Sequence, residues 1–387
     1  MSQINVRNLS NENDDGAPDI VGVSTFSATS YFVPPVGTTV ERPDNPQGGD
    51  LRFNTDTASL EYFKGDTLGW TQIEMTSPDL DGGARGLVMG GELQPGAGAL
   101  PIDYVTIPSL GNAKDFGDLS QARGTGGACA STIRAYCISG YGNSPVTYSD
   151  VIDYATISSK GTAIVFGSLS AACQGVDVLS NRTRGVFTSG SNGTAPTYGI
   201  TAVLSYINLS TSGLVKTFGD QGRTNNYSGT CSSSTRGIIA GGYDPYNTVA
   251  NTIEYITIAT TGNAIDFGDF GGIRRGPMGI SNSTRGVFAG GITPTYLNNI
   301  DYITIATTGD TTTFGDLSNA SGDGRYMRST GMASPTRGLF QGGNSNPLKV
   351  NDIDYVEIAT TGDSQDFGDL TAAMAAAPGC SNAHGGL

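Results

Sequence analysis

Positive charge, histidine, tryptophan and long apolar runs are scarce in this sequence, and each scarcity limits what the chain does. The 387 residues include 21 Lys and Arg against 35 Asp and Glu, which gives a formal net charge of −14. Direct binding to nucleic acid needs a Lys/Arg surface that meets the phosphates, so this charge balance argues against it. No apolar run approaches the roughly 20 residues of a membrane span, which predicts no membrane insertion. The polar start MSQINVRNLSNENDD lacks the charged and apolar regions of a signal peptide, so we expect synthesis in the cytoplasm.

Motifs for metal binding and catalysis are scarce as well. The cysteines are odd in number and form no CxxC pair: Cys129, Cys137, Cys173, Cys231 and Cys380. This pattern supports neither a disulfide framework nor a zinc site. No phosphate-binding loop or HExxH sequence occurs, and Asp79-Leu80-Asp81-Gly82 is only a fragment of a calcium loop. We therefore expect no cofactor and no metal.

What the sequence does have is a sixfold repeat with one invariant spacing. The repeated tyrosines are Tyr104, Tyr154, Tyr206, Tyr255, Tyr302 and Tyr355. Twelve residues after each comes a Phe that is always followed by Gly: Phe116, Phe166, Phe218, Phe267, Phe314 and Phe367. A period of roughly 50 residues with strand-like segments is typical of stacked β units.

Each repeat predicts four short strands. An Arg, an apolar run and a small pair form one strand, most clearly in TRGVFAGG (284–291) and TRGLFQGG (336–343). The next strand, as in IDYITI (300–305), carries bulky apolar residues on both faces, which indicates burial on both sides. A turn leads to a short strand that ends at Phe-Gly-Asp, and one more strand fits before the next Arg, as in residues 276–281. Four strands in each unit predict the blade of a β-propeller.

The two ends of the repeat region predict how it closes. The first unit begins directly at the strand of Arg85, and residues 377–385 at the C-terminus resemble the missing strand. The predicted fold is therefore all-β: a six-bladed propeller of four-stranded blades over residues 81–387, closed by a C-terminal strand that joins the first blade.

The repeat resembles a known family of propellers. The motifs TRGxxxGG, IDYxTIATTG and FGDL over residues 84–387 resemble kelch-like propeller repeats in virion proteins of tailed phages, notably phages of marine bacteria. Residues 49–57, 60–63 and 69–70 resemble a short β module of phage tail-fibre and structural proteins. The chain departs from ordinary kelch proteins because Phe stands where a Trp usually ends each repeat.

The N-terminal residues predict two further parts. Residues 1–47 are polar and include Tyr31-Phe32-Val33-Pro34-Pro35, which its prolines hold extended. We expect this segment to be an arm that orders against other subunits, with a disordered tail as the alternative. Residues 48–80 predict a small β-meander with Trp70 as its core aromatic.

The repeated charges, which include one Arg in each repeat, have two interpretations: a ring of ligands or catalytic carboxylates, or structural contacts. Acids precede the repeated Tyr at Asp103, Asp153, Glu254, Asp301 and Asp354, and a further set, Asp118, Asp220, Asp269, Asp316 and Asp369, follows Phe-Gly. We predict ion pairs between blades and turn caps, because structural networks also cluster charge. His384, the only histidine, is predicted to replace the repeated Arg, and no Ser-His-Asp arrangement can be built around it. We expect no catalytic residues, with a carboxylate pair for glycoside hydrolysis as the alternative.

Length variation predicts where the chain binds. The Arg-to-Tyr spacing ranges from 17 to 22, and one connection between repeats, around residues 319–326, is five residues longer than the others. Both kinds of connection leave an antiparallel blade on the same face, and binding residues concentrate in such variable loops. The candidate binding residues on this rim are Tyr141, Tyr148, Tyr198, Tyr243, Tyr246, Tyr296, Arg325 and Tyr326. Tyr rings suit sugar or protein surfaces; alternatively, each ring packs on its own loop beside a Pro.

The family resemblance implies a role in a phage particle. It implies a non-enzymatic tail or tail-fibre protein, located in the virion, whose N-terminal arm binds other tail proteins. The rim would bind a host surface glycan or another virion protein, and trimers are expected by analogy with tail fibres. The alternatives are a purely structural decoration protein of tail or capsid, a polysaccharide depolymerase and a cellular kelch-type adaptor.

Overall fold

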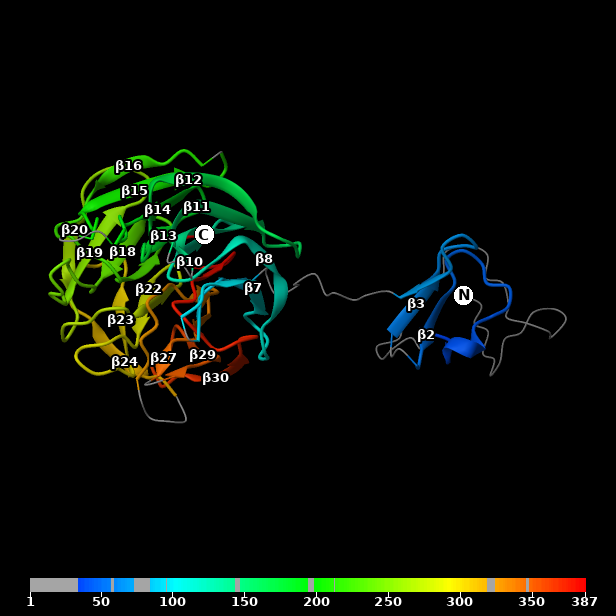
Figure 1. Cartoon of the computed structure of the whole chain (residues 1–387). Helices are drawn as coiled ribbons and strands as arrows, with labels where there is room; N and C mark the ends of the chain where they lie inside the picture. The colour runs from blue at the N-terminus through cyan, green and yellow to red at the C-terminus, as the bar shows by residue number, and fades with distance from the viewer. Residues whose placement is uncertain are drawn as a thin grey trace, which may run out of the picture. The chain divides into compact units, whose positions relative to one another are not determined.

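The chain folds into two compact units, Met1–Pro78 and Asp79–Leu387. The computed structural model describes residues 34–56, 59–72, 84–94, 96–142, 147–193, 198–211, 213–318, 324–345 and 348–387. Over these residues the protein is all-β, as predicted, and its only helical element there is the single turn η1 (Thr39–Glu41). Figure 1 shows the two units, which are described separately below.

The first unit is a small sheet in the order β1 (Val36–Gly37), β2 (Leu51–Asn54), β3 (Ser59–Phe63) and β4 (Trp70–Gln72). The predicted meander corresponds to β2–β4, whereas the parallel strand β1 comes from the segment assigned to the arm. Residues 1–33 of that arm lie outside the described residues. Trp70 packs against Phe63 with ring centroids 5.5 Å apart. Arg42 lies 6.0 Å from the Trp70 ring centroid and pairs with the buried Glu61 at 2.7 Å.

The second unit contains six four-stranded antiparallel sheets (Figure 1). In sheet order they are β32 (Gly379–Ser381), β5 (Arg85–Met89), β7 (Ala99–Thr106), β8 (Lys114–Arg123); β9 (Gly127–Ala130), β10 (Arg134–Gly142), β11 (Thr147–Thr156), β12 (Ile164–Cys173); β13 (Val178–Ser180), β14 (Arg184–Phe187), β15 (Val203–Asn208), β16 (Lys216–Asp220); β17 (Gly229–Ser232), β18 (Arg236–Ala240), β19 (Thr252–Thr257), β20 (Ile265–Asp269); β21 (Met278–Ser281), β22 (Arg285–Ala289), β23 (Asn299–Thr304), β24 (Thr312–Asp316); and β25 (Met332–Ala333), β26 (Arg337–Gln341), β29 (Asp352–Glu357), β30 (Gln365–Asp369). Two short pairs, β31 (Met374–Ala375) with β6 (Glu92–Leu93) and β27 (Asn344–Ser345) with β28 (Leu348–Lys349), decorate the connections.

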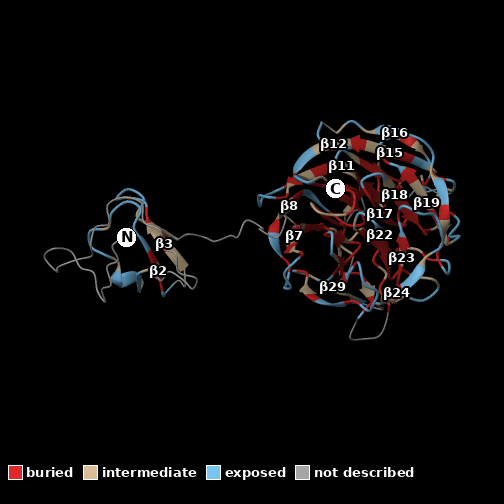
Figure 2. Cartoon of the chain, turned by 180° about the vertical axis from the view of Figure 1, so that it is seen from behind, coloured by how far each residue is buried: buried red, intermediate tan, exposed pale blue. Residues whose placement is uncertain are grey.

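Burial decreases from the first strand of each sheet to the fourth. All four residues of β21 are buried, whereas β24 exposes three of its five residues. Figure 2 shows the buried residues gathered in the interior strands. In β23 the neighbours Ile300 and Asp301 are both buried although they point to opposite faces, which confirms the prediction that this strand is covered on both sides.

The C-terminal strand completes the first sheet, as predicted. β32 pairs antiparallel with β5 so that Cys380 lies opposite Leu87. The contacts where β32 meets β5 match those of the turn in a continuous repeat, although the two strands come from opposite ends of the second unit. The Asn382 Oδ1 accepts the Arg85 N–H at 2.9 Å, just as the Asn282 Oδ1 accepts the Arg285 N–H at 2.8 Å. The C-terminal segment therefore occupies the place of the strand that the first repeat lacks.

Contacts between sheets follow one circuit. Each first strand contacts the next, from β32 through β9, β13, β17, β21 and β25, and β25 contacts β32 again. Figure 1 shows the six sheets around a shared centre, near which the C-terminus lies.

A second circuit of backbone hydrogen bonds explains the invariant Tyr-to-Phe spacing. The glycine in the turn after each third strand donates its N–H to the Phe carbonyl of the preceding sheet. The six bonds are Gly161 to Phe116, Gly213 to Phe166, Gly262 to Phe218, Gly309 to Phe267, Gly362 to Phe314 and Gly111 to Phe367, with N···O distances of 2.7–3.3 Å. A change in the length of this turn would displace both the glycine and the Phe, so the spacing is fixed by contact on two sides.

The Gly that follows Phe is required by the same contact. Gly268 has φ +150°, and a Cβ there would lie 2.4 Å from the Gly309 carbonyl oxygen. We expect Gly268→Ala to lower the free energy of unfolding by about 2 kcal/mol or more, from backbone strain plus overpacking. Denaturant unfolding measures this loss. Gly271→Ala is the matched control because nothing lies within 4 Å of its Cβ, and an equal loss in both variants would contradict the explanation.

The repeated Arg joins neighbouring sheets through a ring and a carbonyl. Each guanidinium lies over the repeated Tyr of its own sheet, for example 4.3 Å from the Tyr302 centroid for Arg285. Arg285 also donates to the Ile358 carbonyl of the next sheet at 2.8 Å. The predicted role of this Arg in ion pairs between blades is therefore largely replaced by cation–π stacking and carbonyl binding.

Candidate functional site

The variable connections lie against one another at one end of each sheet. In five sheets the segment that enters the sheet forms an isolated bridge to a residue near the end of the second strand or shortly after it. These five bridges are Gly124 with Tyr141, Gln174 with Ser191, Asn226 with Tyr243, Arg275 with Ile292, and Tyr326 with Asn344. The residues predicted for the rim are thus distributed over adjoining loops, though Pro145 and Pro196 beside two of them lie outside the described residues.

Arg325 does not belong to a surface site. Its side chain is 0% exposed, forms an ion pair with Asp354 and donates to the Asp352 carbonyl at 3.3 Å. Burial lowers the pKa of Arg325 to about 10. The prediction of a binding role fails because the loop folds this guanidinium inward to neutralise a buried carboxylate.

Other acids that precede the repeated Tyr also have partners, and two of these partners are arginines. Arg123 pairs with Asp153 at 2.7 Å, and Arg274 pairs with Asp301. Asp103 instead accepts hydrogen bonds from Thr371 N at 3.0 Å and Oγ1 at 2.8 Å, and burial raises its pKa. The partners come from the connection that enters the sheet. This agrees with the structural interpretation of these acids.

Several rim tyrosines pack on neighbouring side chains. Tyr243 stacks on Tyr227 with ring centroids 5.6 Å apart, and Tyr296 meets Tyr326 edge-on at 6.5 Å. The Tyr141 hydroxyl donates to the Gly96 carbonyl at 3.4 Å. These side chains therefore contact neighbouring connections, whereas the alternative predicted that each ring packs on its own loop beside a Pro.

Two arginines hold this aromatic group together. Arg275 lies 5.1 Å from the Tyr243 centroid, and Arg328 lies 5.0 Å from that of Tyr326. Arg328 also pairs with Glu92 at 2.8 Å, and burial raises the pKa of Tyr326 to about 12. Sequence reasoning missed Tyr227, Arg275 and Arg328. The available signal was their place in the segment just before a first strand; at the position of Tyr227, two other repeats have glycine, Gly175 and Gly276.

Three predicted residues come together in one pocket. Tyr148, Tyr198 and Tyr243 line a cavity of about 340 Å³. The remaining lining residues are Gln174, Ser191, Gly193, Ile200, Pro245 and Asn247. They derive from the second, third and fourth sheets and their connections. Tyr246 lies outside this lining, and its side chain is 74% exposed.

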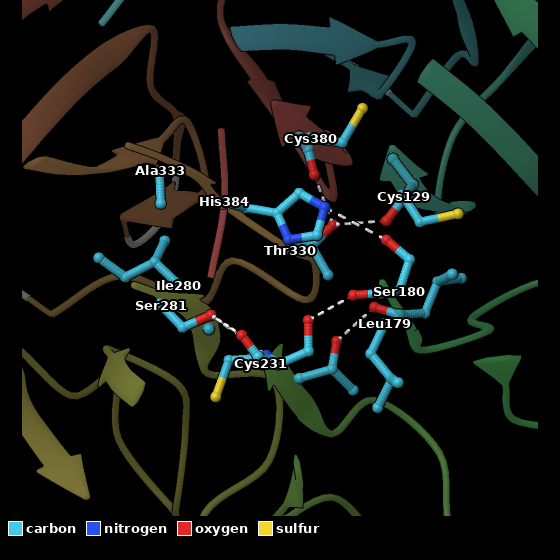
Figure 3. Close-up of a pocket in the computed structure, with 17 residues that line it drawn as sticks. Cys129, Leu179, Ser180, Cys231, Ile280, Ser281, Thr330, Ala333, Cys380 and His384 are labelled. Carbon is cyan, nitrogen blue, oxygen red and sulfur yellow. Dashed lines mark hydrogen bonds between the residues drawn. The ribbon is translucent and has the colours of Figure 1, made fainter. Parts of the chain in front are cut away.

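The C-terminal residues lie at the other end of the first strands, away from the variable connections. His384 lies in a cavity of about 40 Å³ lined by the first strands (Figure 3). Its Nε2 donates to the Ala130 carbonyl at 3.1 Å and its Nδ1 accepts the Gly386 N–H at 3.1 Å. His384 therefore does not replace the repeated Arg, since Arg85 itself follows the shared turn. Burial raises the pKa of nearby Cys129 to about 12, so that thiol is protonated at neutral pH.

Burial of His384 predicts a pH effect on stability. Burial lowers its pKa from 6.5 to about 4, so the neutral ring stabilises the fold fully above pH 6.5, and this contribution is lost as pH falls toward 4. We expect His384→Gln to reduce the drop in melting temperature between pH 7 and 5. Burial raises the pKa of Asp177 to about 7, so its contribution to stability grows as pH falls from 7 to 5. This contribution is the same in the wild-type and the His384→Gln proteins and does not affect their difference. Identical pH profiles for the two chains would contradict this account.

Comparison with known proteins adds no relative. No protein-family model matches the chain, and no curated protein matches its sequence. In the described part of the chain, no group of three or more His, Cys, Asp or Glu residues is placed to hold a metal ion. No helix among the described residues has the length and apolarity to cross a membrane.

Proposed function

We propose that the second unit, Asp79–Leu387, is a closed, six-bladed, kelch-like β-propeller that serves as a non-enzymatic binding module. The two circuits of contacts support closure, because both the strand contacts and the Gly-to-Phe bonds return from the sixth sheet to the first. In such a ring β32 covers the edge of β5, and a propeller leaves only short edges on its outer strands.

The pocket between the variable loops carries the functional proposal. Three rim tyrosines from different sheets share one cavity of about 340 Å³, a size in the range of ligand sites. The constant turns at the other end are occupied by contacts between sheets. We therefore assign binding to the variable rim and structural closure to the constant turns.

The proposed setting is the tail or tail fibre of a phage particle, on the strength of the repeat motifs and the β module before them. The N-terminal unit would attach the chain to other tail proteins, the chain would form trimers, and the rim would contact a host surface glycan. The alternative is a structural decoration protein of tail or capsid, which the inward-packed Tyr141, Tyr296 and Tyr326 favour.

Immunogold electron microscopy with antibody against the full chain tests the setting. Label on the tail or fibres of particles is expected. Label on the capsid shell alone would favour decoration, and particles without label would overturn a virion role. Binding of the full chain to immobilised host surface glycans tests the rim separately.

A further inference from the structure

The rim pocket contains no charged side chain in its described lining. Its apolar surface comes from the tyrosine rings, Ile200 and Pro245, and its polar side-chain groups are two amides, the Ser191 hydroxyl and the tyrosine hydroxyls. A carboxylate or phosphate that entered here would lose solvent without gaining an opposite charge. The lining therefore favours a neutral ligand.

The polar groups of the pocket retain hydrogen-bonding capacity. Among the described residues, the side-chain amides of Gln174 and Asn247 have no hydrogen-bond partner. Ser191 Oγ accepts the Gly193 N–H at 3.3 Å, which leaves its own O–H available to donate. Amides and hydroxyls both donate and accept, as the hydroxyls of a sugar require.

Aromatic rings supply the second half of sugar recognition. One face of a pyranose ring carries C–H groups, and the amphipathic ring of Tyr suits such a face. The Tyr198 side chain is 42% exposed, so part of its ring is open to a ligand.

Two residues of the pocket wall have left-handed backbone. Tyr198 and Asn247 have φ +54° and +61°. This conformation is rare for a bulky residue such as Tyr198, whereas Asn adopts it more readily. The surrounding bonds fix both residues, since the Tyr198 carbonyl accepts Asn192 N–H at 2.7 Å and Asn247 N–H donates to the Asp244 carbonyl at 3.0 Å. The two residues are thus held in place before a ligand arrives.

We infer that this pocket binds one neutral hexopyranose residue of a glycan, with Tyr198 stacked on the ring and Gln174, Ser191 and Asn247 bonded to its hydroxyls. The inference rests on the proposed binding function and names its ligand class. A single sugar buries few atoms, so an affinity of about 1 mM is expected for the free monosaccharide.

Ligand-observed NMR on the full chain tests the inference with glucose, galactose and N-acetylglucosamine as neutral probes, and glucuronic acid and N-acetylneuraminic acid as acidic probes. At least one neutral sugar is expected to bind at least about tenfold more tightly than both acids. Tyr198→Asn, which tolerates the left-handed backbone, and Gln174→Ala are each expected to weaken binding about tenfold. Leu110→Ala is the control, because this exposed residue lies in the turn after β7, outside the pocket lining. Matching thermal unfolding confirms that each variant is folded.

The outcomes separate this inference from the function on which it rests. Preference for an acidic sugar, or neutral-sugar binding unchanged in Tyr198→Asn, would overturn the pocket assignment while rim binding to glycans stands. No binding of any probe would overturn the pocket assignment too; binding of the wild-type chain to immobilised host glycans then decides whether the rim recognises glycans at all.

Discussion

Deletion of residues 376–387 from the full chain is expected to lower the melting temperature by at least about 10 °C or to prevent folding. The deletion removes β32, which covers β5 and contacts both β9 and β25. It also exposes the hydrogen-bonding edge of β5 and the apolar Leu87 opposite Cys380. Calorimetry or circular dichroism of the deleted and intact chains measures the difference.

A second variant, in which the deleted strand is moved to the start of the repeats, tests whether the stability depends on the strand itself or on its C-terminal position. Residues 376–383 placed directly before Ala84 would recreate the Asn-x-x-Arg turn of residues 282–285, because Ala383 and Ala84 fill the two middle positions. The transplanted chain is expected to recover most of the lost stability. Melting of the deleted chain at the temperature of the intact chain would disprove the closure by β32.

Breaking the ion pair between Arg123 and Asp153 is expected to cost about 3–5 kcal/mol of unfolding free energy. Both side chains are almost fully buried, at 1% and 0% exposure, with N···O 2.7 Å. Asp153 keeps only the hydrogen bonds from Ser120, N at 3.1 Å and Oγ at 2.8 Å, once the guanidinium is gone. Arg123→Met, which preserves apolar volume, isolates the charge, and denaturant unfolding gives the loss.

The third sheet supplies the matched control for this pair. At the corresponding positions it carries Cys173 and Ser205, so one of the six sheets is built without either charge. The double variant Arg123→Met with Asp153→Ser is therefore expected to be more stable than Arg123→Met alone. Additive losses in the two single variants would show that the pair is not coupled.

Local pattern was enough to predict the sheets. The alternating strand segments, the small pair after each second strand and the constant interval from Tyr to Phe all recur six times, and each copy folds into the same four strands. The missing first strand was predictable because residues 377–385 have no partner in their own repeat. These features depend on residues close in sequence or on a simple count of strands.

Partners of the buried charges could not be read from the sequence. The repeated Arg was expected to meet the repeated acids, but it lies on the Tyr of its own sheet, while the acids meet Arg123, Arg274 and Arg325 from less regular connections. Arg325 was expected to be exposed because it follows the longest connection between repeats. Its side chain is instead buried against Asp354, a residue of another strand that the sequence did not identify as its partner.

The sequence by itself determined the all-β class, the six repeated sheets and the C-terminal strand that completes the first sheet. The class and the sheets follow from the strand period, and the C-terminal strand follows from the unpaired edge of the first repeat. Tertiary structure alone decided that Tyr148, Tyr198 and Tyr243 share a pocket, whereas Tyr296 and Tyr326 pack on each other. The reason is that the pocket wall is made by side chains about 100 residues apart, from Tyr148 to Asn247, on three neighbouring sheets. The left-handed backbone of Tyr198 in this wall was not predictable either, because bulky residues rarely adopt it.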